Sequence, residues 1–181
     1  MSMIDELEYH AGMTETPAPM PQGGSVAFLL SQLGALAARE FARRLEPLGL
    51  TPSEAGVLRG LGGGEPRSQR ALADALDVHA TRLVSVVGGL ERRGLVARER
   101  RAGDRRAYVL SLTPAGREAL AGVAAAGRAQ EREFTRGLSA DERAALVDAL
   151  QGVAARQGLT PGVHPGLGGR GGRPPTPRSG T

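Results

Sequence analysis

The stretch Leu90–Pro114, LERRGLVARERRAGDRRAYVLSLTP, constrains the fold of this chain more than any other part of the sequence. A helical pattern stops at Gly94, and alternating apolar and polar residues predict strands over Leu95–Arg101 and Arg106–Leu112. Residues 92–106 carry seven arginines and two acidic residues, a formal charge of +5. A hairpin with such a tip is typical of a wing that meets DNA phosphates, and a solvated charged hairpin is the alternative. The sequence upstream must decide between them.

Composition excludes several function classes. The chain has 181 residues, of which 40% are hydrophobic, so we expect one domain with a core. Cysteine is absent, which excludes disulfides, thiolate-bound zinc, cysteine nucleophiles and thiol-based oxidation sensing. The first 24 residues contain no arginine or lysine, and no apolar run reaches the roughly 18 residues of a spanning helix. We therefore expect a soluble cytoplasmic protein without a membrane partner.

Both ends of the chain lack hydrophobic periodicity. Residues 1–24 and 158–181 are rich in proline, glycine and threonine, and neither can bury enough apolar surface to offset the entropy of ordering. We expect both to be disordered, the first as an acidic tail and the second as a Pro/Gly/Arg tail. The folded domain is expected to span residues 25–157.

Two helices are predicted at the start of this domain. Ser25 can cap a helix whose apolar residues recur at helical spacing, with a face wide enough for partners on two sides. Pro47 and Gly49 end it. The run Thr51-Pro52-Ser53-Glu54 is a capping box with proline at the first helical position, and it opens a second helix through Leu61.

A helix-turn-helix is predicted next. Gly62-Gly63-Gly64 is a connector, because no lysine follows to make it a phosphate-binding loop. Ser68 caps a short helix that ends near Leu76, and another helix runs from about His79 to Arg93. The second of these helices has an apolar face and an opposite face with short polar side chains, which can approach base edges in a major groove. The residues of that opposite face are Thr81, Arg82, Ser85, Gly88 and Gly89.

Two further helices follow the hairpin. Thr113-Pro114 starts a helix that reaches about Arg136. Ser139 and Glu142 form a second capping box for a last helix with an apolar face of Leu146, Val147 and Leu150. The predicted fold is therefore mainly α with a small β-wing: a winged helix-turn-helix domain flanked by N- and C-terminal helices.

This order of elements resembles the MarR family of transcriptional regulators over residues 25–157. The segments that carry the resemblance are Leu50-Thr51-Pro52, Ser68-Gln69-Arg70-Ala71-Leu72-Ala73, Leu90-Glu91-Arg92-Arg93-Gly94-Leu95-Val96 and, most specifically, Asp104-Arg105-Arg106 leading into Leu110-Ser111-Leu112-Thr113-Pro114-Ala115-Gly116. The resemblance implies a homodimer whose first and last helices interleave. It further implies that one winged helix per subunit enters successive major grooves of a pseudo-palindromic double-stranded operator, typically as a repressor.

The resemblance also implies roles for the wing and for two helix starts. Asp104 would steady the wing, Arg106 would enter the minor groove and Arg105 would neutralise a phosphate. Ser68 and Gln69, at a helix N-terminus, would contact phosphate without reading sequence.

The recognition helix departs from the family pattern. We expect Thr81, Arg82 and Ser85 to read bases. Many members carry Ser/Thr-Arg where this chain has Val84-Ser85, so the base met by Arg82 is left open. His79 stands where members often show serine, and it is either a phosphate contact or an ordinary exposed turn histidine.

The sequence shows no pattern that indicates an enzyme or a metal site. The three histidines are far apart and no metal-ligand spacing occurs, so we expect no enzyme, metal or cofactor. As a DNA-binding regulator, the protein is expected to be cytoplasmic and associated with the nucleoid. The alternatives are a winged-helix module that docks an acidic protein and a non-specific architectural DNA-binding protein. The resemblance implies a small, often aromatic effector between the dimer helices and the winged helix, but no residue identifies it. With only two tyrosines and three phenylalanines in the chain, aliphatic walls and arginine would hold an aromatic effector.

Overall fold

The computed structural model describes residues 24–101 and 104–164, with the side chains of residues 101 and 104–107 outside that description. The chain divides into two compact units, residues 1–35 and residues 36–181, and the boundary falls within the first helix. The predicted tail 1–24 lies almost wholly outside the described residues, as does 165–181 of the second tail.

The first helix, α1 (Val26–Leu45), starts where the sequence predicts. The Oγ atom of Ser25 accepts a hydrogen bond from the Phe28 amide at 3.2 Å, which satisfies an otherwise orphaned amide of the first turn. A single 3-10 turn, Glu46–Leu48, follows α1, and Gly49 then takes a φ of +61°, which glycine adopts without steric cost. The predicted stop at Pro47 and Gly49 is confirmed.

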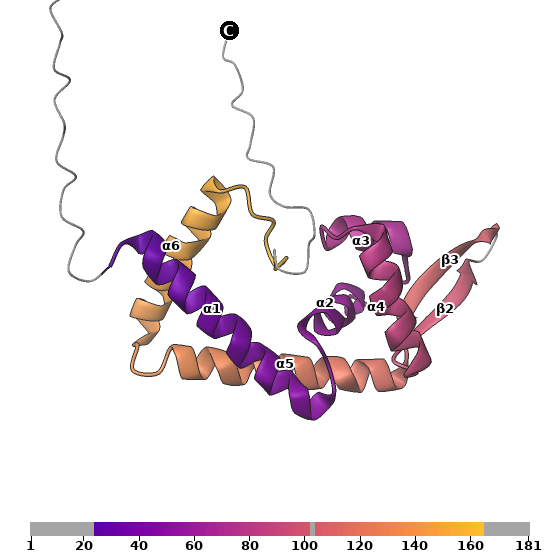
Figure 1. Cartoon of the computed structure of the whole chain (residues 1–181), viewed down its shortest axis with the longest axis horizontal. Helices are drawn as coiled ribbons and strands as arrows, with labels where there is room; N and C mark the ends of the chain where they lie inside the picture. Colours follow the sequence, from indigo (N-terminus) through magenta and orange to yellow (C-terminus); the bar gives the residue numbers. More distant parts are fainter. Residues whose placement is uncertain (1–23, 102–103, 165–181) are drawn as a thin grey trace, which may run out of the picture. The chain divides into compact units, whose positions relative to one another are not determined.

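The predicted helix-turn-helix is present as α3 (Gln69–Ala75) and α4 (Ala80–Arg92), packed with α2 (Pro52–Leu61) as Figure 1 shows. The turn between α3 and α4 is tight. Asp77 adopts a φ of +50°, and the Val78 amide donates to the Ala73 carbonyl at 3.0 Å. Aspartate tolerates the left-handed region better than most residues, which suits it to this turn.

Three antiparallel strands form the sheet, in the order β1-β3-β2. The wing consists of β2 (Val96–Arg101) and β3 (Asp104–Leu112), in a register that pairs Val96 with Leu112 and becomes irregular next to Arg101. The third strand begins two residues earlier than predicted. β1 (Arg67–Ser68) pairs with β3 and was not predicted, because two residues are too few to show an alternating pattern.

The hydrophobic core lies between α2, α3, α4 and the sheet, and it includes the end of α1 and one face of α5 (Pro114–Phe134). Each fully buried leucine in it contributes about 1.5–3 kcal/mol relative to an exposed one. The largest fully buried side chains are Leu45, Leu58, Leu72, Leu83, Leu90, Leu110, Val87 and Val123.

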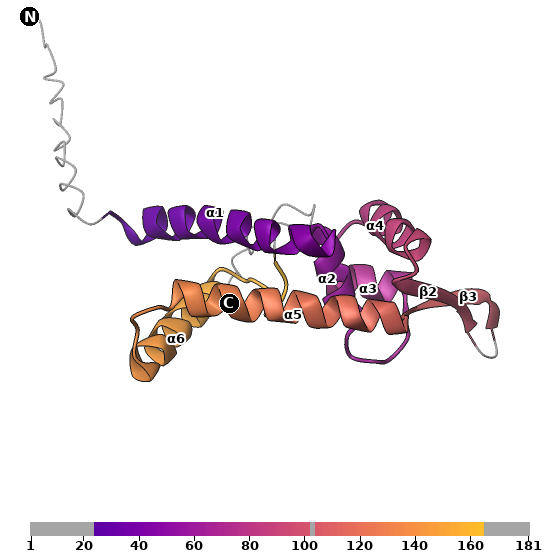
Figure 2. The ribbon, with the colours of Figure 1, turned by 90° about the horizontal axis from the view of Figure 1, so that it is seen from below.

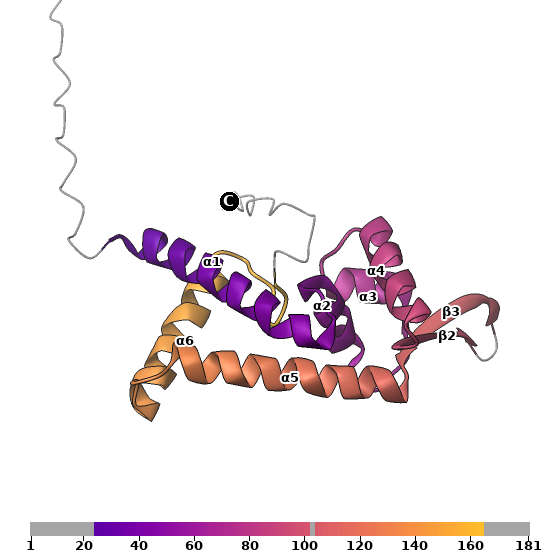
Figure 3. The ribbon, with the colours of Figure 1, turned by 60° about the horizontal axis from the view of Figure 1, so that its bottom comes forward.

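The long helix α5 joins the winged helix to α6 (Ala140–Arg156). Figure 2 and Figure 3 show α5 starting at the base of the wing, passing α2 and leading into α6. The predicted capping box of α6 is present: the Glu142 amide donates to Ser139 Oγ at 3.2 Å, and the Ser139 amide donates to Glu142 Oε2 at 2.8 Å. After α6, residues 158–164 form turns. In the described part of the chain, no helix combines the length and the apolar character needed to cross a membrane.

Candidate nucleic-acid interface

The candidate recognition helix α4 has one buried side and one exposed side. Leu83, Val87 and Leu90 are at most 1% exposed and fix the helix against the core. Thr81 and Ser85, one turn apart, both lie on the exposed side, as the sequence predicts. Their side chains are short, so a partner could approach the helix backbone closely at this point.

Arg92 continues this exposed row and was not predicted as part of it. It lies seven residues after Ser85, two turns along the same face, and is exposed. One of its terminal guanidinium nitrogens lies 3.6 Å from the point where a Cβ on Gly88 would stand. Helical periodicity places Arg92 on this face, but the sequence analysis assigned it only to the basic stretch 92–106 and to the family-like segment Leu90–Val96, not to the base-reading residues.

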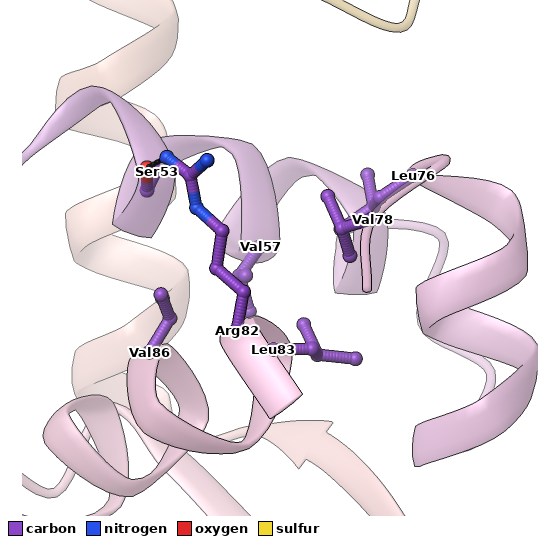
Figure 4. Close-up of a pocket in the computed structure, with 7 residues that line it drawn as sticks. All are labelled: Ser53, Val57, Leu76, Val78, Arg82, Leu83 and Val86. Atoms are coloured by element: carbon purple, nitrogen blue, oxygen red, sulfur yellow. Dashed lines mark hydrogen bonds between the residues drawn. The ribbon is translucent and has the colours of Figure 1, made fainter. Parts of the chain in front are cut away.

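Arg82 lies apart from Thr81 and Ser85. A terminal nitrogen of its guanidinium donates to the Oγ of Ser53, at the start of α2, at 3.3 Å, as Figure 4 shows. Its side chain thus covers a small depression between α2 and α4, together with Val57 and Val86. The structure therefore groups two of the three predicted base readers and places the third on the flank toward α2.

The predicted phosphate-contacting residues lie at the starts of α3 and α4. Ser68 caps α3, with its Oγ accepting from the Ala71 amide at 3.1 Å, and its hydroxyl hydrogen can still be donated to another group. Gln69 is the first residue of α3 and is half-buried. His79 is exposed and is the N-cap residue of α4, where its side chain makes no capping hydrogen bond.

The wing carries arginines close to the C-terminal end of α4. Asp104, Arg105 and Arg106 are the first three residues of β3, but their side chains lie outside the described residues. In β2, Arg98 forms an ion pair with Glu91 of α4, with Nε 3.1 Å from the carboxylate. This pair joins the wing to α4, and Arg100, two residues further along β2, is exposed.

A cavity of about 580 Å³ lies between the second half of α1, α2, α5 and the C-terminal segment. Gln130 of α5 donates to the carbonyl of Ala37 in α1 at 2.8 Å, which ties two of its walls together. Its volume falls in the range of pockets that bind small molecules. The lining residues are Ala37, Ala38, Phe41, Pro52, Ser53, Arg59, Gly127, Gln130, Glu131, Phe134 and His164.

Comparison with known proteins identifies the family to which this chain belongs. The profile of the MarR family matches residues 48–107, which run from the 3-10 turn before α2 into the wing. A putative transcriptional regulatory protein for the hcr operon of Thauera aromatica is 37% identical over 139 residues, which are 76% of this chain and 84% of that protein. This chain belongs to the MarR family. It is a transcriptional regulator with a winged-helix DNA-binding fold, as the sequence predicts.

Two solved structures are similar to this MarR-family chain over most of their length. The transcriptional repressor CouR bound to a 23-mer DNA duplex is 30% identical, covers 72% of this chain and 92% of its own, and has a TM-score of 0.64. CouR from Rhodococcus jostii RHA1 bound to p-coumaroyl-CoA is 27% identical, with coverages of 72% and 91% and a TM-score of 0.60. In the described part of this chain, no group of three or more histidine, aspartate or glutamate side chains is placed to hold a metal ion.

Proposed function

We propose that this MarR-family regulator binds a pseudo-palindromic operator as a homodimer, with α4 of each subunit in a major groove and the wing beside it. The observation that carries the proposal is the exposed row Thr81, Ser85 and Arg92 on a helix whose opposite side is locked in the core. A rigid helix with short polar side chains suits base readout, and the neighbouring arginines suit phosphate contact. We infer no catalytic activity and no cofactor.

The contacts are assigned residue by residue. Thr81 and Ser85 read base edges, and Arg82 joins them only when its guanidinium leaves Ser53. The residues at the helix starts, Ser68, Gln69 and His79, contact phosphates. In the wing, Asp104 steadies the hairpin, Arg105 neutralises phosphate and Arg106 enters the minor groove.

The homodimer is supported by apolar side chains that a single chain leaves in solvent. On α6, Leu146, Val147 and Leu150 are 41–45% exposed, and on α1 Leu33 is 52% exposed. Clusters of exposed apolar residues mark protein interfaces, and a two-fold pairing of these helices would bury them. A dimer also presents two copies of α4, as a symmetric operator requires.

An effector is proposed for the 580 Å³ cavity. Among its lining residues, Phe41 and Phe134 supply aromatic surface, Arg59 a positive charge and Glu131 a negative one. These groups suit a small aromatic acid or its thioester. The similar CouR structure with p-coumaroyl-CoA supports this class of ligand. Because the cavity is bounded by both α2 and α5, a ligand there would change how the winged helix is held and so change operator affinity.

The decisive experiment selects bound duplexes from a random DNA pool and then measures affinity for the enriched site at several salt concentrations. We expect an inverted repeat and an affinity that falls steeply with salt. Arg106→Ala should weaken binding by tenfold or more. Arg136→Ala is the matched control: its side chain is 76% exposed and pairs with Glu133 on the surface of the chain, so it should leave affinity unchanged.

The other outcomes separate the alternatives. Salt-dependent binding without an enriched motif would indicate an architectural protein. No binding, equal in wild type and Arg106→Ala, would indicate a module that docks protein. Sedimentation of wild type and Leu150→Glu tests the homodimer separately: we expect a dimer for the first and a shift toward monomer for the second, and a wild-type monomer at micromolar concentration would contradict it.

A further inference from the structure

The exposed side of α4 carries two parallel rows of small side chains. One row is Thr81 and Ser85, with hydroxyl groups, and the other is Ala80 and Val84, with methyl groups. All four residues are exposed, and Val84 is 50% exposed. Residues four apart lie above one another on a helix, so the hydroxyl row and the methyl row run side by side.

Val84 has no evident role in folding. The buried side of α4 already holds Leu83, Val87 and Leu90, and Val84 is not part of the core that they form. Single exposed valines are common and need no explanation by themselves. The surroundings of Val84 are more specific. The next residue in its row is Gly88, which has no side chain and beside which the Arg92 guanidinium lies, and the nearest arginine before it, Arg82, is held by Ser53. The two methyl groups of Val84 therefore lie on the solvent-exposed side of α4, next to the hydroxyl groups of Thr81 and Ser85.

We propose that Val84 reads the 5-methyl group of a thymine in each half of the operator, while the hydroxyl of Ser85 or Thr81 donates to O4 of the same base. In the major groove only thymine presents a methyl group beside an acceptor, and the two rows of α4 match that pair. This proposal rests on the proposed binding of an operator by α4. It assigns specificity to van der Waals contact at a helix position that holds no charged side chain.

Deoxyuridine isolates the predicted contact, since it differs from thymidine only by the missing methyl group. Burial of one methyl-sized group contributes about 0.8 kcal/mol, which corresponds to roughly a fourfold change in affinity per half-site. A cytosine at the same position also replaces the O4 acceptor by an amino donor, so it should reduce affinity further.

The test uses the 181-residue chain and the operator obtained from the random pool. Each thymine is replaced in turn by deoxyuridine, symmetrically in both half-sites, and the Kd is measured for wild type, Val84→Ala, Val84→Thr and Ser85→Ala. For wild type we expect one position at which the replacement weakens binding by roughly fourfold per half-site. For Val84→Ala the same replacement should have a much smaller effect, because both γ-methyl groups that would contact the thymine methyl group are gone.

The remaining variants are controls. Val84→Thr keeps one methyl group at nearly the same volume and should retain part of the deoxyuridine effect. Ser85→Ala should weaken binding while keeping that effect in full. Because Val84 is half-exposed, Val84→Ala should fold, and an unchanged melting temperature verifies it.

Two results would overturn the proposal. If wild type binds every deoxyuridine operator as tightly as the thymine operator, or if Val84→Ala keeps the same sensitivity, Val84 reads no thymine methyl group while operator binding stands. If the pool enriches no sequence at all, both the operator proposal and the thymine readout are wrong.

Discussion

Gly116, in the first turn of α5, lies directly against the backbone of Leu95, and a Cβ atom on residue 116 would overlap the Leu95 carbonyl oxygen. That carbonyl accepts a hydrogen bond from the amide of Thr113 at 3.2 Å, and the hydroxyl of Thr113 donates to the neighbouring Gly94 carbonyl at 2.7 Å. Thr113 in turn caps α5 by accepting from the Gly116 amide at 3.0 Å. The end of α4, the base of the wing and the start of α5 are therefore held together at one point that has no room for a side chain.

Replacing Gly116 by alanine should destabilise the protein, because α5 and the wing cannot both keep their positions. Overpacking of this kind costs about 1–3 kcal/mol, which thermal or urea unfolding would detect. Gly127→Ala is the matched control on the same helix. A Cβ there meets nothing within 4 Å, so the higher helix propensity of alanine should raise stability by about 0.5–1 kcal/mol. Equal effects of the two substitutions would contradict the close contact.

The elements and their caps could be predicted because the signals are local. Thr51, Ser68 and Ser139 each precede a helical pattern by one residue, and in all three cases the side chain caps that helix. The contact between Gly116 and Leu95 could not be predicted, since it joins residues about twenty positions apart and depends on how α5 packs. Local chemistry thus predicts where helices begin, whereas their mutual approach requires the tertiary structure.

Glu54 should contribute to stability through two separate interactions. Its Oε2 accepts from the Thr51 amide at 2.8 Å, and its Oε1 pairs with Arg93, the C-cap residue of α4, at 3.0 Å. We expect Glu54→Ala to cost about 1–2 kcal/mol and Arg93→Ala about 0.2–1 kcal/mol, because the second variant keeps the capping box.

A double-mutant cycle of Glu54→Ala and Arg93→Ala measures how much the ion pair between these two residues contributes. The coupling energy should equal the pair interaction, about 0.2–1 kcal/mol, and additive effects would show that the pair contributes nothing. Arg136→Ala is again a suitable control. Its ion pair with Glu133 is more exposed on both sides, so its removal should be close to neutral.

The candidate site was only partly predictable. Thr81 and Ser85 follow from the periodicity of α4, which alone separates the exposed side from the core side. The hydrogen bond from Arg82 to Ser53 joins residues 29 positions apart and changes what Arg82 offers to a partner. A pattern of residue types cannot show which of two neighbouring elements a long side chain contacts, so the sequence grouped Arg82 with the others.

Lowering the pH should reduce the contribution of Glu142, in the first turn of α6, to the stability of the protein. Hydrogen bonds from the backbone and then the side chain of Ser139 lower the pKa of Glu142 from its ordinary value of 4.5. A carboxyl whose pKa is lower in the folded state stabilises the fold above its unfolded pKa, and this contribution disappears as the pH falls through the folded value. The difference in melting temperature between wild type and Glu142→Ala should therefore be largest near neutral pH and shrink below pH 4.5. A difference that stays constant from pH 7 to pH 3 would show that the charge of Glu142 is irrelevant.

The cavity between α1, α2 and α5 should bind an effector only while it stays open. Gly127 lines it, and because a Cβ on this residue meets nothing within 4 Å, Gly127→Leu should fill part of the space without a backbone clash. A ligand at a hundred times its Kd raises stability by about 2.7 kcal/mol, so thermal unfolding with benzoate, 4-hydroxybenzoate and p-coumaroyl-CoA reports binding directly. We expect at least one of them to raise the melting temperature of wild type and to weaken operator binding. In Gly127→Leu both effects should be lost, with operator affinity in the absence of ligand unchanged. An equal response in the two proteins would place the ligand elsewhere, and no response in wild type would remove aromatic acids and their thioesters as effectors.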